Sequence, residues 1–566
     1  FFFFAPITPM RATSTQPSGI AARASMRGGR LRATPAARAS LRADARRPLT
    51  YACGIIGIAT DGASVPVELY EGLLMLQHRG QDSSGMVTYD GARFREHKKN
   101  GLVKDVFEKD VMDKLDGPMG IGHVRYPTAG SSSASEAQPF FVNSPLGIYL
   151  IHNGNLTNTD VLRERLQQQC DLSYRRHLRT ESDSEVLLNI FADEVHRAHK
   201  MDPQAAQQAL VFSAVKATMD QVKGAYSVIT LIGQVGLFAF RDPHGIRPLV
   251  LGHRVSASGK DEWAFASEDA AFGPIGFKRV RDIAPGEAVL ATLDGRLISE
   301  QVVPGKLCPC IFEYIYLARP DSTINDIPVY EMQLNLGRRL AKKIVERGWD
   351  IDTVVPVPDG SRPAAIEIAA ALGLPYREGL VKNRYVGRTF IMPNQSMREM
   401  SVRRKLNAMS AVFEGKTVLL VDDSIVRGTT MTQIVEMCRR AGAKTVYLAS
   451  ASPPVKYPNV YGVDMPSRKE FVANELSEQQ VCDVLGADGL IYQTVDDLLA
   501  AGDEMAQLMD SPVHRWDAAC FDGHYVGGDV TDEMLRFLEE GGRGKGRTGA
   551  NMVTAARAAE EEPCIP

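Results

Sequence analysis

The feature that most constrains the fold is a mainly apolar segment, residues 415–421, that ends in two adjacent acids and a loop of small residues. A run of aliphatic residues without polar alternation is typical of a strand buried on both faces, as in a parallel sheet covered by helices. A helical stretch follows at 430–440, and we predict similar strands at 352–358 and 444–450 with another helix at 362–372. This alternation predicts an α/β domain with a parallel sheet, whose ligand site lies at the carboxyl edge of the strands.

Two aspartates, Asp422 and Asp423, stand at that edge. Paired acids there can hold ribose hydroxyls and Mg²⁺, and the N–H groups of the following loop can cradle a 5′-phosphate at the helix N-terminus. Residues 418–430 as a whole resemble the signature of type I phosphoribosyltransferases. The resemblance implies a site for 5-phosphoribosyl 1-pyrophosphate made of Asp422, Asp423, Ser424, Ile425, Val426, Arg427, Gly428, Thr429 and Thr430.

A basic segment lies between two of these strands. Residues 382–405 carry seven basic side chains against one acid, Glu399. A charge run is usually a solvated face, but beside a phosphate site a basic flap would neutralise the pyrophosphate leaving group and exclude water. We therefore predict pyrophosphate contacts from Lys382, Arg384 and Lys405.

Another buried strand is predicted to begin at Cys53 and to continue through the apolar, glycine-containing residues 54–58. A cysteine in such a position is more often a small core residue than a nucleophile. Four further segments favour the nucleophile, because together and in this order they resemble the glutaminase domain of N-terminal-nucleophile amidotransferases. The resemblance extends from Cys53 to about residue 298 and rests on residues 76–83 (LQHRGQDS), 122–128 (GHVRYPT), 152–155 (HNGN) and 182–185 (SDSE).

Hydrolysis of the glutamine side-chain amide needs a nucleophile, a base and an oxyanion stabiliser. By this resemblance the thiol of Cys53 is the nucleophile, and its own α-amino group, with a reference pKa of about 7.7–8.0, is the base. The site is then active only when Cys53 is the first residue of the mature chain. The resemblance also implies an oxyanion hole formed by Asn153 and the backbone N–H of Gly154.

The same resemblance assigns glutamine recognition. Arg125 would hold the α-carboxylate of glutamine as a two-pronged donor, and Asp183 would pair with its α-ammonium group. Arg79 and residues 126–136 would belong to a loop that closes over the bound substrate, and His152 would also contribute to the glutamine site.

Together the two halves resemble the glutamine phosphoribosylpyrophosphate amidotransferases. This implies an α+β N-terminal-nucleophile glutaminase, which is a four-layer αββα sandwich, followed by an α/β type I phosphoribosyltransferase domain with a parallel sheet. Ammonia released from glutamine would pass internally to phosphoribosyl pyrophosphate, giving 5-phosphoribosylamine, glutamate and pyrophosphate in the first committed step of purine biosynthesis. The expected parts are a removed targeting segment (1–52), the glutaminase (53–298), the phosphoribosyltransferase (299–540) and a flexible tail (541–566).

The family resemblance also assigns Mg²⁺ to Ser361, Asp422 and Asp423, although this chain has Asp359-Gly360 where the family usually reads Glu-Thr. It further implies purine nucleotides as feedback inhibitors and a homo-oligomer, either a dimer or a tetramer. The predicted flap residues that line the ammonia channel are Tyr385, Arg388 and Ile391.

One subgroup of the family carries a four-cysteine iron–sulfur cluster. Here Cys310 fits one ligand position and Cys520 another, while Asn459 or its neighbours occupy a third. Two thiolates cannot hold a cubane cluster, so we predict no iron–sulfur cluster.

The first fifty residues resemble a targeting segment. They contain nine arginines, one acid and neither lysine nor glutamate, a composition typical of organellar transit peptides. The opening FFFFAP without an initiator Met indicates a fragment of a longer precursor, and its Phe-Ala-Pro run resembles the motif that follows the signal peptide in proteins sent to plastids of secondary origin. We predict the plastid stroma, with the mitochondrion, reached by a presequence starting at Met10, or the cytoplasm as alternatives.

Charge and hydropathy argue against other partners, and two rival functions stay open. A formal net charge of −3 gives no reason to expect nucleic-acid binding, and no apolar stretch reaches the roughly 18 residues of a membrane span. The first rival is another glutamine-dependent amidotransferase, such as a hexosamine-forming synthase, which would lack the signature at 418–430. The second is a catalytically silent regulator on a phosphoribosyltransferase fold, against which the intact set of Cys53, Arg125, Asn153 and Gly154 argues.

Overall fold

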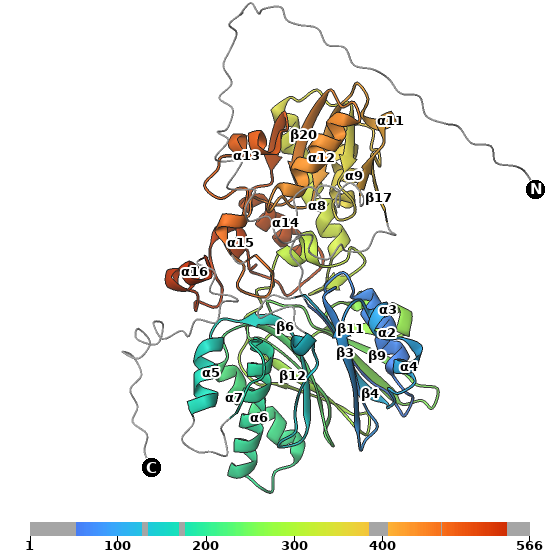
Figure 1. Cartoon of the computed structure of the whole chain (residues 1–566), viewed down its shortest axis with the longest axis vertical. Helices are drawn as coiled ribbons and strands as arrows, with labels where there is room; N and C mark the ends of the chain where they lie inside the picture. Colours follow the sequence, from blue (N-terminus) through green and yellow to red (C-terminus); the bar gives the residue numbers. More distant parts are fainter. Residues whose placement is uncertain (1–52, 127–133, 169–175, 384–405, 466, 540–566) are drawn as a thin grey trace, which may run out of the picture.

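The computed structural model describes residues 53–126, 134–168, 176–383, 406–465 and 467–539. The predicted targeting segment and C-terminal tail lie outside these residues. Two parts follow each other along the long axis of the molecule (Figure 1), with the N-terminal sheets at the bottom and the C-terminal sheet at the top. No helix within the described ranges is long and apolar enough to cross a membrane.

The first N-terminal sheet is antiparallel. Strand β1 (Gly54–Ala59) lies in its interior, between β10 (Asp261–Ala266) and β4 (Met119–Arg125). Every residue of β1 is buried, because helix α2 (Pro66–Met75) covers one face of the sheet and a second sheet covers the other. Burial on both faces explains why this strand reads as an uninterrupted apolar run. In spatial order the strands are β11 (Lys278–Asp282), β9 (Val250–Val255), β10 (Asp261–Ala266), β1 (Gly54–Ala59), β4 (Met119–Arg125), β2 (Ser83–Tyr89) and β3 (Phe94–Asn100).

The second sheet is also antiparallel, and its outer face is covered by helices α6 (Asp183–Met201) and α7 (Gln207–Gln221), with α5 (Thr159–Gln168) beside them. A core of aliphatic side chains, including Ile55 and Ile151, separates the two sheets. The order of layers is therefore helix, sheet, sheet, helix, as predicted. The strands are β13 (Leu297–Gln301), β12 (Glu287–Thr292), β8 (Gly236–Arg241), β7 (Gly224–Ile232), β6 (Ile148–Leu156) and β5 (Phe140–Val142).

The C-terminal sheet is parallel throughout, which confirms the predicted α/β domain. Its four strands are β16 (Thr353–Pro356), β19 (Thr417–Asp422), β20 (Thr445–Ser450) and β21 (Gly489–Tyr492), in that spatial order. A separate antiparallel pair joins β17 (Leu380–Lys382) to β18 (Leu406–Ala408). The main helices are α8 (Val329–Arg347), α9 (Arg362–Leu372), α12 (Thr429–Arg440), α13 (Glu478–Leu485) and α14 (Val495–Leu508).

A continuous hydrophobic core connects the two parts. It gathers η5 (Glu313–Leu317), α15 (Ala519–Asp522), α16 (Asp532–Glu539) and the loop 459–465. The same core contains Val426 from the predicted phosphate loop and Ala225 from β7. The two predicted sites are therefore joined by one packed interior.

Candidate active site

Cys53 lies directly before the first residue of β1. Because β1 and β4 are antiparallel, the start of β1 lies beside the end of β4, and Cys53 is at that edge of the sheet. The residue is 7% exposed, and its Sγ lies 3.8 Å from the carbonyl oxygen of Tyr126. Burial raises the pKa of the Cys53 thiol, while the nearby charge of Arg125 acts in the opposite direction. A raised pKa means that the thiol needs a base to become a nucleophile.

The predicted oxyanion residues lie on β6, in the sheet stacked against β1. Asn153 is fully buried, and neither its side-chain oxygen nor its side-chain nitrogen has a hydrogen-bond partner among the described residues. Gly154 has φ +149°, and a Cβ built there would lie 2.0 Å from the carbonyl oxygen of Ala225. A buried amide without a partner is costly unless a ligand uses it, which fits a donor held ready for a developing oxyanion.

The predicted glutamine-binding residues meet in this region. Asp183 begins α6, and its Oδ2 accepts a hydrogen bond of 3.1 Å from the N–H of Leu156. The ring Nδ1 of His152 lies 3.0 Å from Ser184 Oγ and 3.9 Å from Asp183 Oδ2. Burial lowers the pKa of His152, so the ring is neutral near neutral pH. The neutral histidine leaves the carboxylate of Asp183 available to a cationic ammonium group.

Arg125 is held by an internal carboxylate. Its Nη2 donates to Glu136 Oε2 at 2.6 Å, and both side chains are about 4% exposed. Asp82 Oδ2 lies 3.6 Å from the same guanidinium. A substrate carboxylate at Arg125 would therefore have to take the place of Glu136.

This contact leads to a prediction about substrate affinity. Replacing Glu136 by glutamine should lower the KM for glutamine by about three- to tenfold, because the competing charge-assisted hydrogen bond is worth about 1.5–3 kcal/mol and a neutral amide oxygen keeps about half of that. Steady-state glutaminase kinetics measure this, and synthesis driven by ammonia should not change. A higher KM in the variant would show instead that Glu136 orients Arg125 for its substrate.

The structure shows which groups bind the Arg79 side chain. Its side chain is 1% exposed; its Nε donates to Glu268, and its Nη2 donates to Glu313 Oε2 at 2.8 Å. Burial alone would lower the pKa of the Arg79 guanidinium, but the two carboxylates raise it overall. Arg79 is thus bound by two acids inside the protein, and its part in closing over glutamine stays a prediction.

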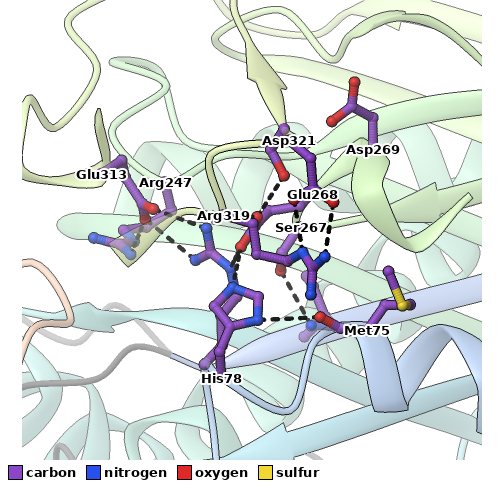
Figure 2. Close-up of polar contacts among 12 residues, drawn as sticks. Met75, His78, Arg247, Ser267, Glu268, Asp269, Glu313, Arg319 and Asp321 are labelled. Carbon is purple, nitrogen blue, oxygen red and sulfur yellow. Dashed lines mark hydrogen bonds and ion pairs between the residues drawn. The ribbon is translucent and has the colours of Figure 1, made fainter. Parts of the chain in front are cut away.

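The acids that hold Arg79 link the two parts of the chain (Figure 2). Glu313 also accepts from Arg247, which is fully buried. Glu268 Oε2 accepts from the N–H of Arg319 at 2.9 Å and from Ser322 Oγ at 2.6 Å. No role was predicted for Glu268, Arg247 or Glu313, because these residues are far from Arg79 in the sequence.

The phosphoribosyl site lies at the end of β19, as predicted. Asp422 ends the strand, and α12 begins at Thr429 after a loop that is buried from Asp423 to Gly428. Gly428 precedes α12 with φ +71°, a backbone conformation that favours glycine. The loop therefore places its backbone at a helix N-terminus, the arrangement that binds phosphate.

The two aspartates fit a divalent cation. Burial, and for Asp422 also the charge of its neighbour, raises the pKa of both carboxyls, to about 7 for Asp423. No cationic side chain within the described ranges pairs with either of them. Mg²⁺ is commonly held by one or two carboxylates together with substrate oxygens, and such a cation would relieve the repulsion between these groups.

Ser361 directly follows the residue that approaches the aspartates, because a Cβ built on Gly360 would lie 2.2 Å from Asp423 Oδ2. Ser361 is fully buried, and its Oγ donates to the carbonyl oxygen of Val357 at 2.7 Å. A hydroxyl oxygen that donates its proton keeps two lone pairs that can bind a cation. Ser361 as the third Mg²⁺ ligand therefore stays a prediction.

Of the predicted pyrophosphate contacts, the structure describes Lys382. Its side chain is half exposed, and its Nζ lies 2.8 Å from Asp359 Oδ2. The remaining predicted flap residues lie outside the described residues: Arg384, Tyr385, Arg388, Ile391 and Lys405.

Cys310 and Cys520 are both buried in the core between the two parts. Cys310 forms an isolated backbone bridge with Asp517, and Asn459 is 1% exposed in the same region of the fold. No group of three or more potential ligands fits a metal ion within the described part of the chain. The absence of a cluster stays a prediction.

Comparisons with known proteins match both halves. The glutamine amidotransferase domain family matches residues 123–274, and the phosphoribosyl transferase domain family matches residues 329–465. The amidophosphoribosyltransferases of Pasteurella multocida and Escherichia coli are each 51% identical to this chain, covering 86% of it and 95% of their own length. A solved structure of glutamine phosphoribosylpyrophosphate amidotransferase from B. subtilis, complexed with ADP and GMP, superimposes with a TM-score of 0.73 at 36% identity, covering 85% of this chain and 98% of that one.

Proposed function

Because the chain belongs to the amidophosphoribosyltransferase family, we propose how its own residues carry out the two half-reactions. The enzyme transfers ammonia from glutamine to 5-phosphoribosyl 1-pyrophosphate, the first step of purine biosynthesis. One observation carries the proposal: a single packed molecule contains both sets of residues. Cys53 lies at the start of β1 and an unpartnered Asn153 amide on the stacked sheet, while the Asp422 loop lies at a helix N-terminus.

At the first site, the α-amino group of a mature N-terminal Cys53 takes the proton of the thiol. The thiolate attacks the side-chain carbonyl carbon of glutamine, and the oxyanion that forms is stabilised by the Asn153 amide and the Gly154 N–H. As this intermediate collapses, the amide nitrogen takes the proton from the α-ammonium group of Cys53 and leaves as neutral ammonia, and a thioester remains on Cys53. Water then hydrolyses the thioester to glutamate and restores the thiol. Arg125 and Asp183 hold the two charged α-substituents of the substrate.

At the second site, the loop 424–428 and the start of α12 bind the 5′-phosphate through backbone N–H groups. Asp422 and Asp423 hold the ribose hydroxyls and Mg²⁺, which supplies charge neutralisation when bound. Lys382 is placed by Asp359 for the pyrophosphate group. Ammonia forms the bond to C1 as the bond to pyrophosphate breaks.

Removal of the cation with a chelator should abolish pyrophosphate release, and added Mg²⁺ should restore it.

A direct experiment uses protein engineered to begin at Cys53. Glutamate and pyrophosphate release are measured with glutamine, in the presence and absence of Mg²⁺ and phosphoribosyl pyrophosphate. Matched release of both products supports the proposal. Glutamate without pyrophosphate would indicate a glutaminase that serves another acceptor, and binding of the sugar phosphate without either product would indicate a regulator.

We also propose that residues 1–52 direct the protein to the plastid stroma and are removed there. The arginine-rich, acid-poor composition supports this, as does the need for a free α-amino group on Cys53. Sequencing the N-terminus of the protein isolated from its source, together with the location of a fluorescent fusion of the full precursor, would test it. A mature chain that keeps Ala52 would contradict the proposal.

Feedback inhibition by purine nucleotides and assembly into a dimer or tetramer are further proposals. Their support is the family membership and the B. subtilis relative, which was solved in complex with ADP and GMP. Inhibition curves with purine mononucleotides and sedimentation of the mature enzyme are the measurements that decide them.

A further inference from the structure

A loop of the C-terminal part touches the backbone of the predicted oxyanion hole. A Cβ built on Gly462 would lie 2.8 Å from both the Cα and the carbonyl carbon of Gly154, and 3.0 Å from its carbonyl oxygen. Gly462 has φ +105°, so it combines a conformation that favours glycine with a contact that only glycine allows. The close approach is between two backbones that are far apart in the chain.

A side-chain hydrogen bond holds the same two segments together. Asn155 is 4% exposed, and its Nδ2 donates to the carbonyl oxygen of Val460 at 2.8 Å. Asn155 follows Gly154 directly on β6, so this bond holds the strand beside the predicted oxyanion donor. The contact is therefore specific in geometry as well as close.

The loop 459–465 is itself rigidly built. Asn459 is 1% exposed, and its Oδ1 accepts hydrogen bonds from the N–H groups of Tyr461 at 2.9 Å and Val463 at 3.1 Å. Its own N–H donates to the carbonyl oxygen of Met465 at 2.9 Å. Buried backbone groups satisfied in this way fix one conformation of the loop.

The loop also belongs to the core that contains the phosphoribosyl site. Val460, Tyr461 and Val463 pack in the same hydrophobic cluster as Val426 of the phosphate loop. The cluster includes Ala225 on β7, whose carbonyl oxygen would lie 2.0 Å from a Cβ built on Gly154. Gly154 is thus in close contact with both β7 and the loop of the C-terminal part.

We propose that Gly462 and Asn155 are positioning residues through which the C-terminal part fixes the Cα and carbonyl group of Gly154, and thereby the direction of its N–H. An oxyanion hole works only when its donors point to where the charge develops, and a small rotation of the peptide loses much of the effect. The glutaminase site is then completed by the loop 459–465, so its turnover depends on the packing around the phosphoribosyl loop. This inference rests on the proposed function of the glutaminase site.

The test replaces Gly462 by alanine in the full mature enzyme. We expect the kcat for glutamine hydrolysis to fall by about 10²-fold or more, the usual cost of losing one oxyanion donor. The KM for glutamine should stay within about twofold, since the residues that hold the substrate's charged groups do not touch Gly462. Synthesis driven by ammonia should keep at least half of the original rate.

Gly528→Ala is the matched control. Gly528 also has a positive φ, +66°, in the C-terminal part, but a Cβ there would meet nothing within 4 Å. It carries the same kind of backbone strain without the contact, and we expect both activities to be retained. Asn155→Ala is the second variant; it deletes the bond to Val460 and should lower glutaminase kcat several-fold with ammonia-driven synthesis intact.

Two results would overturn the proposal. The first is unchanged glutaminase turnover in both Gly462→Ala and Asn155→Ala. The second is an equal loss of the glutamine-driven and ammonia-driven reactions, which would mean that the two residues have a general role in folding. If the unmodified mature enzyme hydrolyses no glutamine, the proposed function itself is wrong, and that result is read before any variant is made.

Discussion

Replacing Cys53 by alanine should lower glutamine-dependent synthesis by roughly 10³-fold or more, because no other group can form the covalent intermediate. Synthesis from free ammonia should continue near the original rate, since the phosphoribosyl site lies in a different part of the fold. The measurement is pyrophosphate release by the mature variant with glutamine and, separately, with ammonium chloride at a mildly alkaline pH, where more of the ammonia is unprotonated.

Cys438→Ala provides the control for that experiment. Cys438 is buried in helix α12 among aliphatic side chains and has no role in the proposed chemistry. Both reactions should survive in it apart from a modest loss of stability. Equal loss of the two reactions in the Cys53 variant would contradict the assignment of the nucleophile.

Replacing Glu313 by alanine should destabilise the protein by about 3–5 kcal/mol, because it leaves the guanidinium groups of Arg79 and Arg247 buried without this carboxylate. Arg247 suffers most, since its Nη2 donates to Glu313 and its Nε and Nη1 have no hydrogen-bond partner among the described residues. Differential scanning calorimetry of the mature enzyme should show a melting temperature lower by about 3–5 °C.

Glu300→Ala is the matched substitution for Glu313→Ala. Glu300 lies on β13 and is exposed, so its loss should change the free energy of unfolding by less than about 0.5 kcal/mol. A melting temperature of the Glu313 variant within about 2 °C of that of the Glu300 variant would show that the buried network contributes little.

The fold was largely predictable because burial leaves a mark on the sequence. The strands at 353–356 and 417–422 are covered on both faces, so residues 354–356 and 418–421 are uniformly apolar, and the acids come where each strand leaves the sheet. The position of Cys53 at the start of a buried strand could be predicted for the same reason. Its catalytic role came from the set of motifs and not from the strand itself.

The contacts of individual side chains were less predictable. Arg79 is separated from Glu268 by 189 residues and from Glu313 by 234, and nothing local in the sequence shows that those acids face it. The hydrogen bond from the Ser361 hydroxyl to a carbonyl four residues earlier was not predicted either. The approach of Gly462 to Gly154 depends on how two domains dock, which local patterns do not record.

The buried network around Arg79 has a consequence for the modularity of the enzyme. A shortened chain that ends near residue 298 would keep Arg79, Arg247 and Glu268 but lose Glu313, and with it the N–H of Arg319 and the hydroxyl of Ser322. Its new surface would expose charges and apolar side chains that the intact chain covers. The glutaminase half therefore cannot simply be fused to another acceptor domain. The new domain would have to supply a carboxylate at the position of Glu313.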